Sequence, residues 1–161
     1  MSPQAAARSE RGAWARAALV LAVVLAVDQA VKALVTTSLQ RGDVREIAAG
    51  IKLVNTRNSG VAFGQLQDGG AIVAVVIAIA VTALLVYFAR HAHQKLVWLP
   101  TGMLLGGALG NIVDRIREGA VIDFLKLPYW PAFNVADAAI TVGVVILLVV
   151  MERGDRARPP A

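Results

Sequence analysis

Four long apolar runs, separated by polar segments, dominate the pattern of hydrophobic and polar positions along the chain. A helix needs about 20 apolar residues to cross the hydrocarbon core of a bilayer. The pattern therefore predicts an all-α membrane protein with four transmembrane helices in one integral membrane domain, residues 1–161, with charged tails at 1–13 and 152–161. The predicted spans cover residues 14–35, 71–89, 96–115 and 135–151.

The first run has a second interpretation, because a basic start followed by a short apolar core is also typical of a cleaved signal peptide. The run continues past Asp28, which favours a permanent helix. Asp28 and Lys32 are four residues apart, so they lie on one helical face and can form an ion pair. We expect this pair near the outer end of the first helix, where it would support a site.

The segment between the first two runs is too polar to cross a membrane and too short to form an independent domain. Within it, Asp43–Ile47 and Ile51–Val54 have the composition of short strands around an Ala-Ala-Gly turn. We therefore expect a small β-rich extracytoplasmic loop region on the outer surface of the bilayer. In the third run, Gly102, Gly106 and Gly110 recur every four residues and predict close helix packing.

Composition supports the membrane class and excludes several kinds of site. The chain is 57% hydrophobic and 17% charged, whereas a soluble domain carries about a quarter charged residues. It contains no cysteine, which excludes disulfides, thiolate metal sites and a cysteine nucleophile. The net charge of +5 arises from residues that flank the apolar runs and form no dense patch for nucleic acid.

The basic residues carry a weak topology signal. Lys and Arg are nearly balanced between the two sides of a four-span arrangement. Their density is higher in the tails and in the short turn from Arg90 to Lys95, which places both termini in the cytoplasm. Asp28, Asp114, Asp123 and Asp137 then all fall near the outer ends of their spans.

The acidic residues are the candidates for catalysis. Acids at the ends of membrane helices are costly to place, so each of them indicates a role. Asp123 and Asp137 lie fourteen positions apart, one after the third run and one at the start of the fourth. If the two runs are antiparallel helices, both carboxylates can meet at the same level. Two such carboxylates share one proton, which provides an ionised base and a neutral acid for hydrolysis by activated water.

Other functions remain open at this point. A small polytopic transporter would place its acids near the bilayer midplane, between repeated halves. A structural membrane protein with an acidic cluster would use Asp114 and Arg115 as a local pair and Asp137 as a helix cap. The pair His91 and His93 lies on the opposite side from the acids, without an HExxH motif for zinc.

Five sequence blocks, in order from the first run to the fourth, resemble the lipoprotein signal peptidase family. The resemblance covers roughly residues 14–151 and leaves out only the charged tails. The blocks are Asp28-Gln29 with Lys32, Arg57–Phe63, Gly107–Asn111 followed by Asp114-Arg115, Val121–Phe124, and Phe133–Asp137.

The resemblance implies an aspartic endopeptidase of the bacterial inner membrane, with its active site near the surface of the outer leaflet. Such enzymes remove signal peptides from diacylglyceryl-modified prolipoproteins, cutting on the amino side of the lipidated cysteine. It implies no metal and no cofactor, and we expect a monomer whose partners are its substrates and membrane lipid. The implied catalytic residues are Asp123 and Asp137. The implied site is lined by Asn58, Asn111, Arg115 and Asn134 and supported by Asp28, Lys32 and Asp114.

Overall fold

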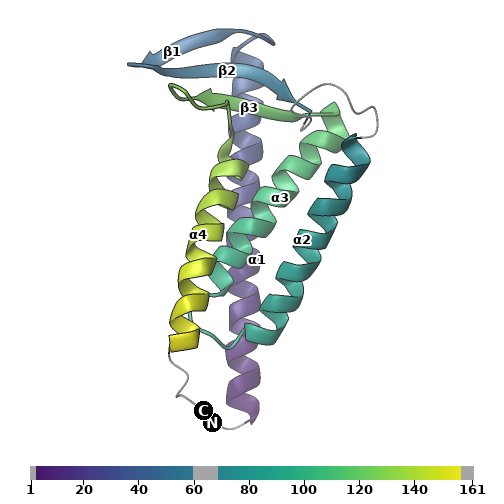
Figure 1. Ribbon diagram of the computed structural model, residues 1–161, viewed down its shortest axis with the longest axis vertical. Coiled ribbons are helices and arrows are strands. Elements are labelled where there is room, and N and C mark those ends of the chain that lie inside the picture. Colours follow the sequence, from purple (N-terminus) through teal and green to yellow (C-terminus); the bar gives the residue numbers. More distant parts are fainter. Residues whose placement is uncertain (1–2, 60–68, 157–161) are drawn as a thin grey trace.

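Four helices form an elongated bundle, and a three-stranded sheet lies across one end of it (Figure 1). The computed structural model describes residues 3–59 and 69–156, so Gly60–Phe63 of the second sequence block lie outside the described residues. The first turn of α1 and the last turn of α4 lie at the end opposite the sheet. The elements are α1 (Pro3–Ser38), β1 (Val44–Ala48), β2 (Ile51–Asn58), α2 (Gly69–His91), α3 (Trp98–Glu118), β3 (Val121–Lys126) and α4 (Val135–Arg156).

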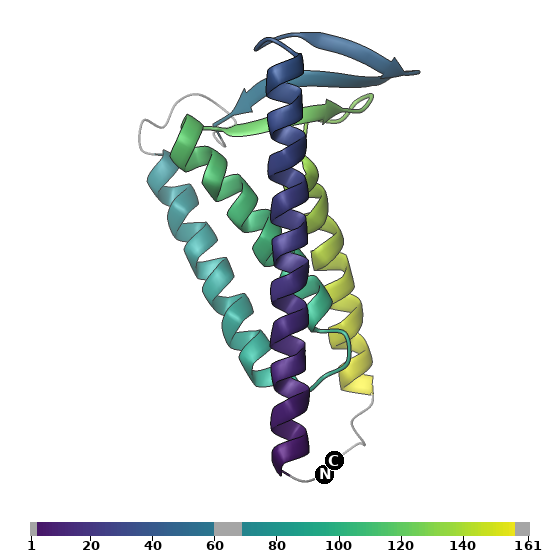
Figure 2. The same cartoon turned by 180° about the vertical axis from the view of Figure 1, so that it is seen from behind.

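Each apolar run of the sequence lies in a helix, and the helices extend into both charged tails. α1 begins at Pro3 and α4 continues to Arg156, because Ala, Arg and Glu in these tails are good helix formers. Only the third run was placed too early, since α3 begins at Trp98. Seen from behind, α1 runs the length of the bundle and reaches the sheet (Figure 2).

α3 is the helix that contacts all three others, and glycine lets two of them approach closely. A Cβ atom at Gly106 would lie 2.8 Å from the backbone oxygen of Leu21 in α1. One at Gly107 would lie 2.6 Å from the backbone oxygen of Ala136 in α4. Neither distance is compatible with a side chain. The contact at Gly106 confirms the close packing predicted for the glycine stripe, whereas Gly107 lies outside that stripe and was not predicted.

The sheet is antiparallel, in the order β1-β2-β3, with β3 next to the bundle. The two predicted strands are confirmed, although β2 continues to Asn58. The prediction was incomplete for residues 121–126, which were read only as a connection between helices. They form β3 because Thr56 of β2 pairs with Asp123 in register, a tertiary contact that no local pattern reveals.

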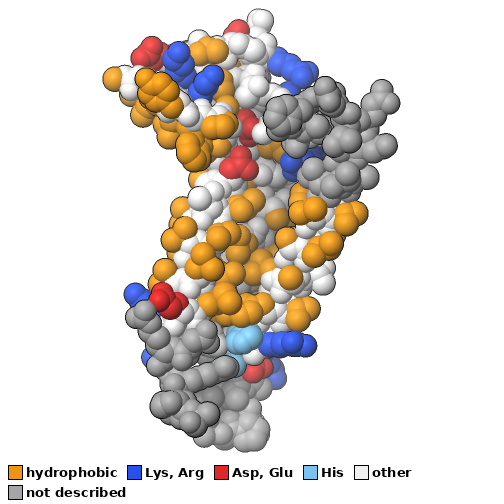
Figure 3. All heavy atoms as spheres, in the orientation of Figure 1, with side chains coloured by type: hydrophobic (Ala, Val, Ile, Leu, Met, Phe, Trp, Pro, Cys, Tyr) orange, Lys and Arg blue, Asp and Glu red, His pale blue; other side chains and the backbone are white. Residues whose placement is uncertain are grey.

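By length and composition, two of the described helices are apolar enough to cross a membrane. They are Ser9–Ser38 within α1 and Val135–Arg153 within α4, while α2 contains a shorter apolar stretch, Val75–His91. α3 carries several polar residues where it lies between the other helices. Hydrophobic side chains cover the middle of the bundle in Figure 3, and charged side chains gather toward its two ends.

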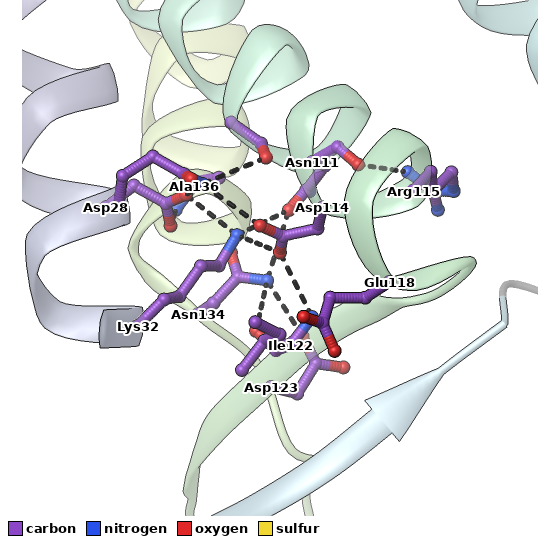
Figure 4. A network of polar contacts seen from close by, with 12 residues as sticks. Asp28, Lys32, Asn111, Asp114, Arg115, Glu118, Ile122, Asp123, Asn134 and Ala136 are labelled. Atoms are coloured by element: carbon purple, nitrogen blue, oxygen red, sulfur yellow. Dashed lines mark hydrogen bonds and ion pairs between the residues drawn. The ribbon is translucent and has the colours of Figure 1, made fainter. Parts of the chain in front are cut away.

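A buried cluster of three ions joins α1 to α3 near the sheet end of the bundle (Figure 4). The Lys32 ammonium lies 2.7 Å from a carboxylate oxygen of Asp28 and 2.7 Å from one of Asp114. It also donates to Asn111 Oδ1 at 3.2 Å. At most 3% of each charged residue is exposed. The predicted pair Asp28–Lys32 therefore forms, and the interpretation of Asp114 as a local partner of Arg115 is wrong.

The same carboxylates hold two further elements. Asp28 Oδ1 accepts from the backbone N–H of Ala136 at 2.9 Å, so α1 satisfies a free donor in the first turn of α4. Asp114 Oδ2 accepts from the backbone N–H of Ile122 at 3.0 Å and so fixes the start of β3. Loss of the cluster would thus release α4 and β3 together.

We expect Lys32→Met to lower the melting temperature in detergent strongly, because it leaves two buried carboxylates without a counter-charge. Breaking a buried ion pair costs about 3–5 kcal/mol. Adding Asp114→Asn should recover part of the loss, since it removes one charge and keeps an acceptor for Ile122. The matched control is Glu118→Gln, which breaks a more exposed ion pair with Arg57 and should cost less than about 1 kcal/mol. Equal melting of Lys32→Met and Glu118→Gln would show that the cluster does not hold the fold.

Candidate active site

The two candidate catalytic carboxylates come from different elements and are held by side-chain amides. Asp123 lies on β3 and Asp137 in the first turn of α4. Asn134 Nδ2 donates to Asp123 Oδ1 at 2.8 Å, and Asn111 Nδ2 donates to Asp137 Oδ1 at 2.8 Å. Asn134 Nδ2 also lies 3.2 Å from Asn111 Oδ1. The two amides therefore form a continuous bridge from one carboxylate to the other.

The start of α4 is built around a reciprocal pair of caps. Asn134 precedes the helix and accepts the backbone N–H of Asp137 at 2.9 Å through Oδ1. In return, Asp137 Oδ2 accepts the backbone N–H of Asn134 at 3.4 Å. This is the geometry of a capping box, so the capping interpretation of Asp137 is correct. Its second oxygen faces Asn111, so capping does not account for the whole carboxylate.

Asp123 is the more buried of the two acids, with 2% of its surface exposed. Its burial disfavours the charged form and raises the pKa of the carboxyl above its usual value. The charge of Asp137 also raises this pKa, while hydrogen bonds from Asn58 and Asn134 and the charge of Lys32 lower it. Asp137 is partly exposed. The two acids therefore have different environments, which is the arrangement that separates an acid from a base.

β2 carries the predicted residue Asn58 to this pair, since Asn58 Nδ2 donates to Asp123 Oδ2 at 3.0 Å. Two supports of β2 were missed from the sequence. Asn55 is buried, donates to the backbone oxygen of Leu39 at 2.8 Å, and accepts from Arg57 at 2.7 Å. Arg57 in turn pairs with Glu118 at 3.2 Å. The polar residues at alternate positions 55 and 57 are a signal that could have indicated them.

Of the predicted site residues, Arg115 alone is not brought to the acids. Its guanidinium donates to the backbone oxygen of Asn111 at 3.3 Å, and the side chain points away from Asp123 in Figure 4. All the others lie in one connected network, through the ion cluster, the amides and the two carboxylates. They are Asp28, Lys32, Asn58, Asn111, Asp114, Asp123, Asn134 and Asp137.

The histidines lie at the other end of the bundle. His91 stacks on Tyr87, with ring centroids 4.2 Å apart, and its Nδ1 lies 2.8 Å from the backbone oxygen of Tyr87. The ring centroids of His91 and His93 lie 6.4 Å apart. Within residues 3–59 and 69–156, no group of three or more His, Asp or Glu side chains is arranged to hold a metal ion.

An apolar cavity of about 480 Å³ opens between α2, α3 and α4 below the site. Its wall on α4 includes Ile140, which follows Asp137 by one helical turn. In Figure 3 this region is a hydrophobic face with acidic side chains above it. The cavity could therefore hold an apolar group whose polar end reaches the carboxylates. It is lined by Ile77, Ala80, Val81, Ala83, Leu84, Tyr87, Leu104, Ala108, Ile140, Val144 and Leu147.

The geometry supports acid–base chemistry on a bond held near the carboxylates. A neutral carboxyl can donate a hydrogen bond to a carbonyl, and an ionised one can take a proton from water. Both acids must be held still for this purpose, and the amide bridge does so. The cavity supplies a place for the apolar part of a substrate.

Comparison with known proteins identifies the family. The family model described as Signal peptidase (SPase) II matches residues 20–153. The chain is 42% identical over 150 residues to the lipoprotein signal peptidase of Symbiobacterium thermophilum, covering 86% of this chain and 98% of the relative. It is 34% identical over 139 residues to that of Halothermothrix orenii, covering 86% and 96%.

A solved structure agrees with the sequence relatives. It is described as a bacterial membrane enzyme determined by the in meso method at 1.9 Å, and it superposes with a TM-score of 0.78 at 28% identity. The match covers 84% of this chain and 91% of that one. Since the family model and the relatives both cover most of the chain, this chain belongs to the signal peptidase II family of lipoprotein signal peptidases, which are membrane proteases.

Proposed function

We propose that this chain is an aspartic endopeptidase that removes the signal peptide from diacylglyceryl-modified prolipoproteins, cutting on the amino side of the lipidated cysteine. The observation that carries this proposal is the amide bridge that joins Asp123 to Asp137 above an apolar cavity. Family membership sets aside the transporter and the structural alternatives.

In the proposed mechanism Asp123 holds the shared proton and Asp137 is ionised. Asp123 donates to the scissile carbonyl oxygen while Asp137 takes a proton from water, and the water oxygen bonds to the carbonyl carbon. The proton on Asp137 then passes to the leaving nitrogen of the cysteine as the C–N bond breaks, and the hydroxyl on the carbonyl returns a proton to Asp123. The burial of Asp123 and the partial exposure of Asp137 support these roles.

Asn111 and Asn134 act in this proposal mainly as positioning residues. Asn134 Nδ2 is within bonding distance of three oxygens, those of Asp123, Asn111 and the Ile122 backbone. Lys32 donates to Asn111 and keeps its amide turned so that Nδ2 faces Asp137. The implied contact of Arg115 with substrate requires a different rotamer from the one that bonds Asn111.

The proposed setting is the bacterial inner membrane. All four helices cross it, both termini are cytoplasmic, and the sheet lies at the outer surface. The hydrophobic middle of the bundle and its charged ends support this arrangement. The apolar cavity then opens near the middle of the bilayer, and it takes an apolar chain of the substrate. The enzyme acts as a monomer.

We expect a synthetic prolipoprotein peptide, which spans the signal-peptide junction and its cysteine, to be cleaved only when the cysteine carries diacylglyceryl. The lipid holds the peptide in the bilayer beside the carboxylates, and effective molarity gained in this way speeds a reaction strongly. Mass spectrometry of the products should locate the cut before the cysteine. Equal cleavage of the unmodified peptide would identify a general membrane protease instead.

Asp123→Asn and Asp137→Asn should each reduce turnover of the lipidated peptide by about 10²–10⁴-fold or more, because either change removes the acid or the base. The double variant should be scarcely worse, since the two groups act as a unit. Asp43→Asn is the matched control, because Asp43 only caps an exposed turn by accepting from Gln40.

Thermal unfolding of the same variants separates catalysis from folding. Asn can retain the cap of α4, so the two single variants should melt near the parent. Near-normal turnover in either one would remove that residue from the mechanism. Unfolding of Asp137→Asn would instead assign Asp137 to capping.

The pH dependence of turnover should report the protonation of Asp123. Its pKa is raised, and the mechanism needs it protonated, so turnover should fall as pH rises through that pKa. The hydrogen bond from Asn58 lowers this pKa. Asn58→Ala should therefore move the alkaline limb of the activity profile to higher pH. The profile of the control Asp43→Asn should be the same as that of the parent. A shift to lower pH would assign the limb to another group.

A further inference from the structure

The first part of the loop between β3 and α4, residues 127–131, presents two large aromatic side chains to its surroundings. Tyr129 is fully exposed and Trp130 is 63% exposed. The backbone N–H of Trp130 donates to the Leu127 oxygen at 3.2 Å and closes a tight turn, with Pro128 and Tyr129 at its centre. We call this segment the aromatic loop.

Folding alone does not explain the tyrosine. Tyr129 has a φ of +60°, a backbone region that glycine and asparagine occupy more readily than aromatic residues. Its ring packs on nothing in return, because it is fully exposed. A strained residue that gains no packing indicates a role outside the fold.

The aromatic loop is joined to the turn between β1 and β2. A Cβ atom at Gly50 would lie 2.8 Å from Cγ of Pro128, so the two turns are in direct contact. Ile47 of the same hairpin is 55% exposed. In Figures 1 and 3 this part of the sheet extends sideways beyond α4, and hydrophobic side chains gather on it.

Positive charge lies beside these apolar groups. Lys52 of β2 is directly opposite Lys126 of β3, and both are exposed. Like charges at opposite positions repel each other. Among the described residues, neither lysine forms a salt bridge, although Glu46 lies opposite Lys52 on β1. The pair is therefore suited to bind an anion.

The aromatic loop is also the covalent link between the two candidate catalytic elements. Leu125 and Phe133 exchange backbone hydrogen bonds of 2.9 Å on either side of it, and Asn134 follows directly. Asp123 precedes the loop and Asp137 follows it. A force that fixes the loop at one depth therefore fixes the carboxylates at that depth.

We propose that the aromatic loop anchors the sheet in the interface of an anionic phospholipid leaflet and so sets the depth of the site. Tyr129 and Trp130 enter the headgroup region, which favours such amphipathic rings. Lys52 and Lys126 contact lipid phosphates. The lipid-facing surface of α4 continues directly into the loop, so one leaflet covers both. This inference rests on the four-span topology and the activity proposed above.

The first test uses fluorescence, because the chain contains only three tryptophans. Trp14→Phe with Trp98→Phe leaves Trp130 as the single emitter in vesicles of phosphatidylcholine and phosphatidylglycerol. Lipids brominated near the glycerol end of their chains should quench it more than lipids brominated near the methyl end, and aqueous iodide should quench it weakly. Strong quenching by iodide with none by brominated lipid would overturn the anchor, as would shielding from both.

A control separates the anchor from the topology. Val145 is exposed midway along α4. With all three native tryptophans replaced by phenylalanine, Val145→Trp should be quenched most by bromine near the methyl end. If this reporter is not quenched, the spanning arrangement itself is wrong.

The second test measures cleavage of the lipidated peptide by Tyr129→Asn with Trp130→Ser. Asparagine adopts the positive φ of residue 129 more readily than tyrosine does, so the variant should melt no lower than the parent. Turnover in detergent should be unchanged, while KM in the mixed vesicles should rise severalfold. Equal losses in detergent and in vesicles would overturn the anchor and assign the loop to the shape of the site. Absence of cleavage by the parent chain would instead refute the proposed function and leave the quenching result standing.

The lysines are tested with Lys52→Gln and Lys126→Gln together. The parent should show a lower KM as phosphatidylglycerol replaces phosphatidylcholine, and the variant should lose this dependence. An unchanged dependence would remove the lysines from the proposal.

Discussion

Everything at the sheet end of the bundle depends on one buried ammonium between two carboxylates. Lys32 balances Asp28 and Asp114 and orients Asn111. In a region of low dielectric an unpaired charge is costly, so the three groups must stay together. Because Asp28 also binds the start of α4 and Asp114 the start of β3, this one contact determines where both candidate catalytic elements begin.

The candidate site is built on those two fixed starts. Asn134 caps α4, bonds Asp123 and accepts from Asp137, so the groups that begin a helix also position the acids. The burial of Asp123 and the partial exposure of Asp137 follow from their elements, since a strand covered by helices hides its side chains more than the first turn of a helix does. The fold thereby gives two identical carboxyl groups different surroundings, and burial raises the pKa of the Asp123 carboxyl.

Local features of the sequence predicted most of this architecture. Long uncharged runs identified the helices, and the spacing of Asp28 and Lys32 identified an ion pair within one helix. Features that depend on distant partners were missed. The ion pair of Asp114 with Lys32 was not predicted because the two residues are remote in sequence, and β3 went unrecognised because its partner strand lies before α2. The position of Arg115 away from the acids depends on a side-chain direction that spacing does not determine.

The pairing of Asp28 with Lys32 within α1 also bears on how the chain is made. α1 is synthesised first, whereas Asp114 and the start of α4, which these residues later contact, emerge much later. A lone aspartate or lysine would hinder insertion of an apolar segment into lipid. Four residues apart, the two neutralise each other on the isolated helix. In the proposed four-span topology, the first helix can thus stay in the bilayer as an electrically balanced unit until its partners are inserted.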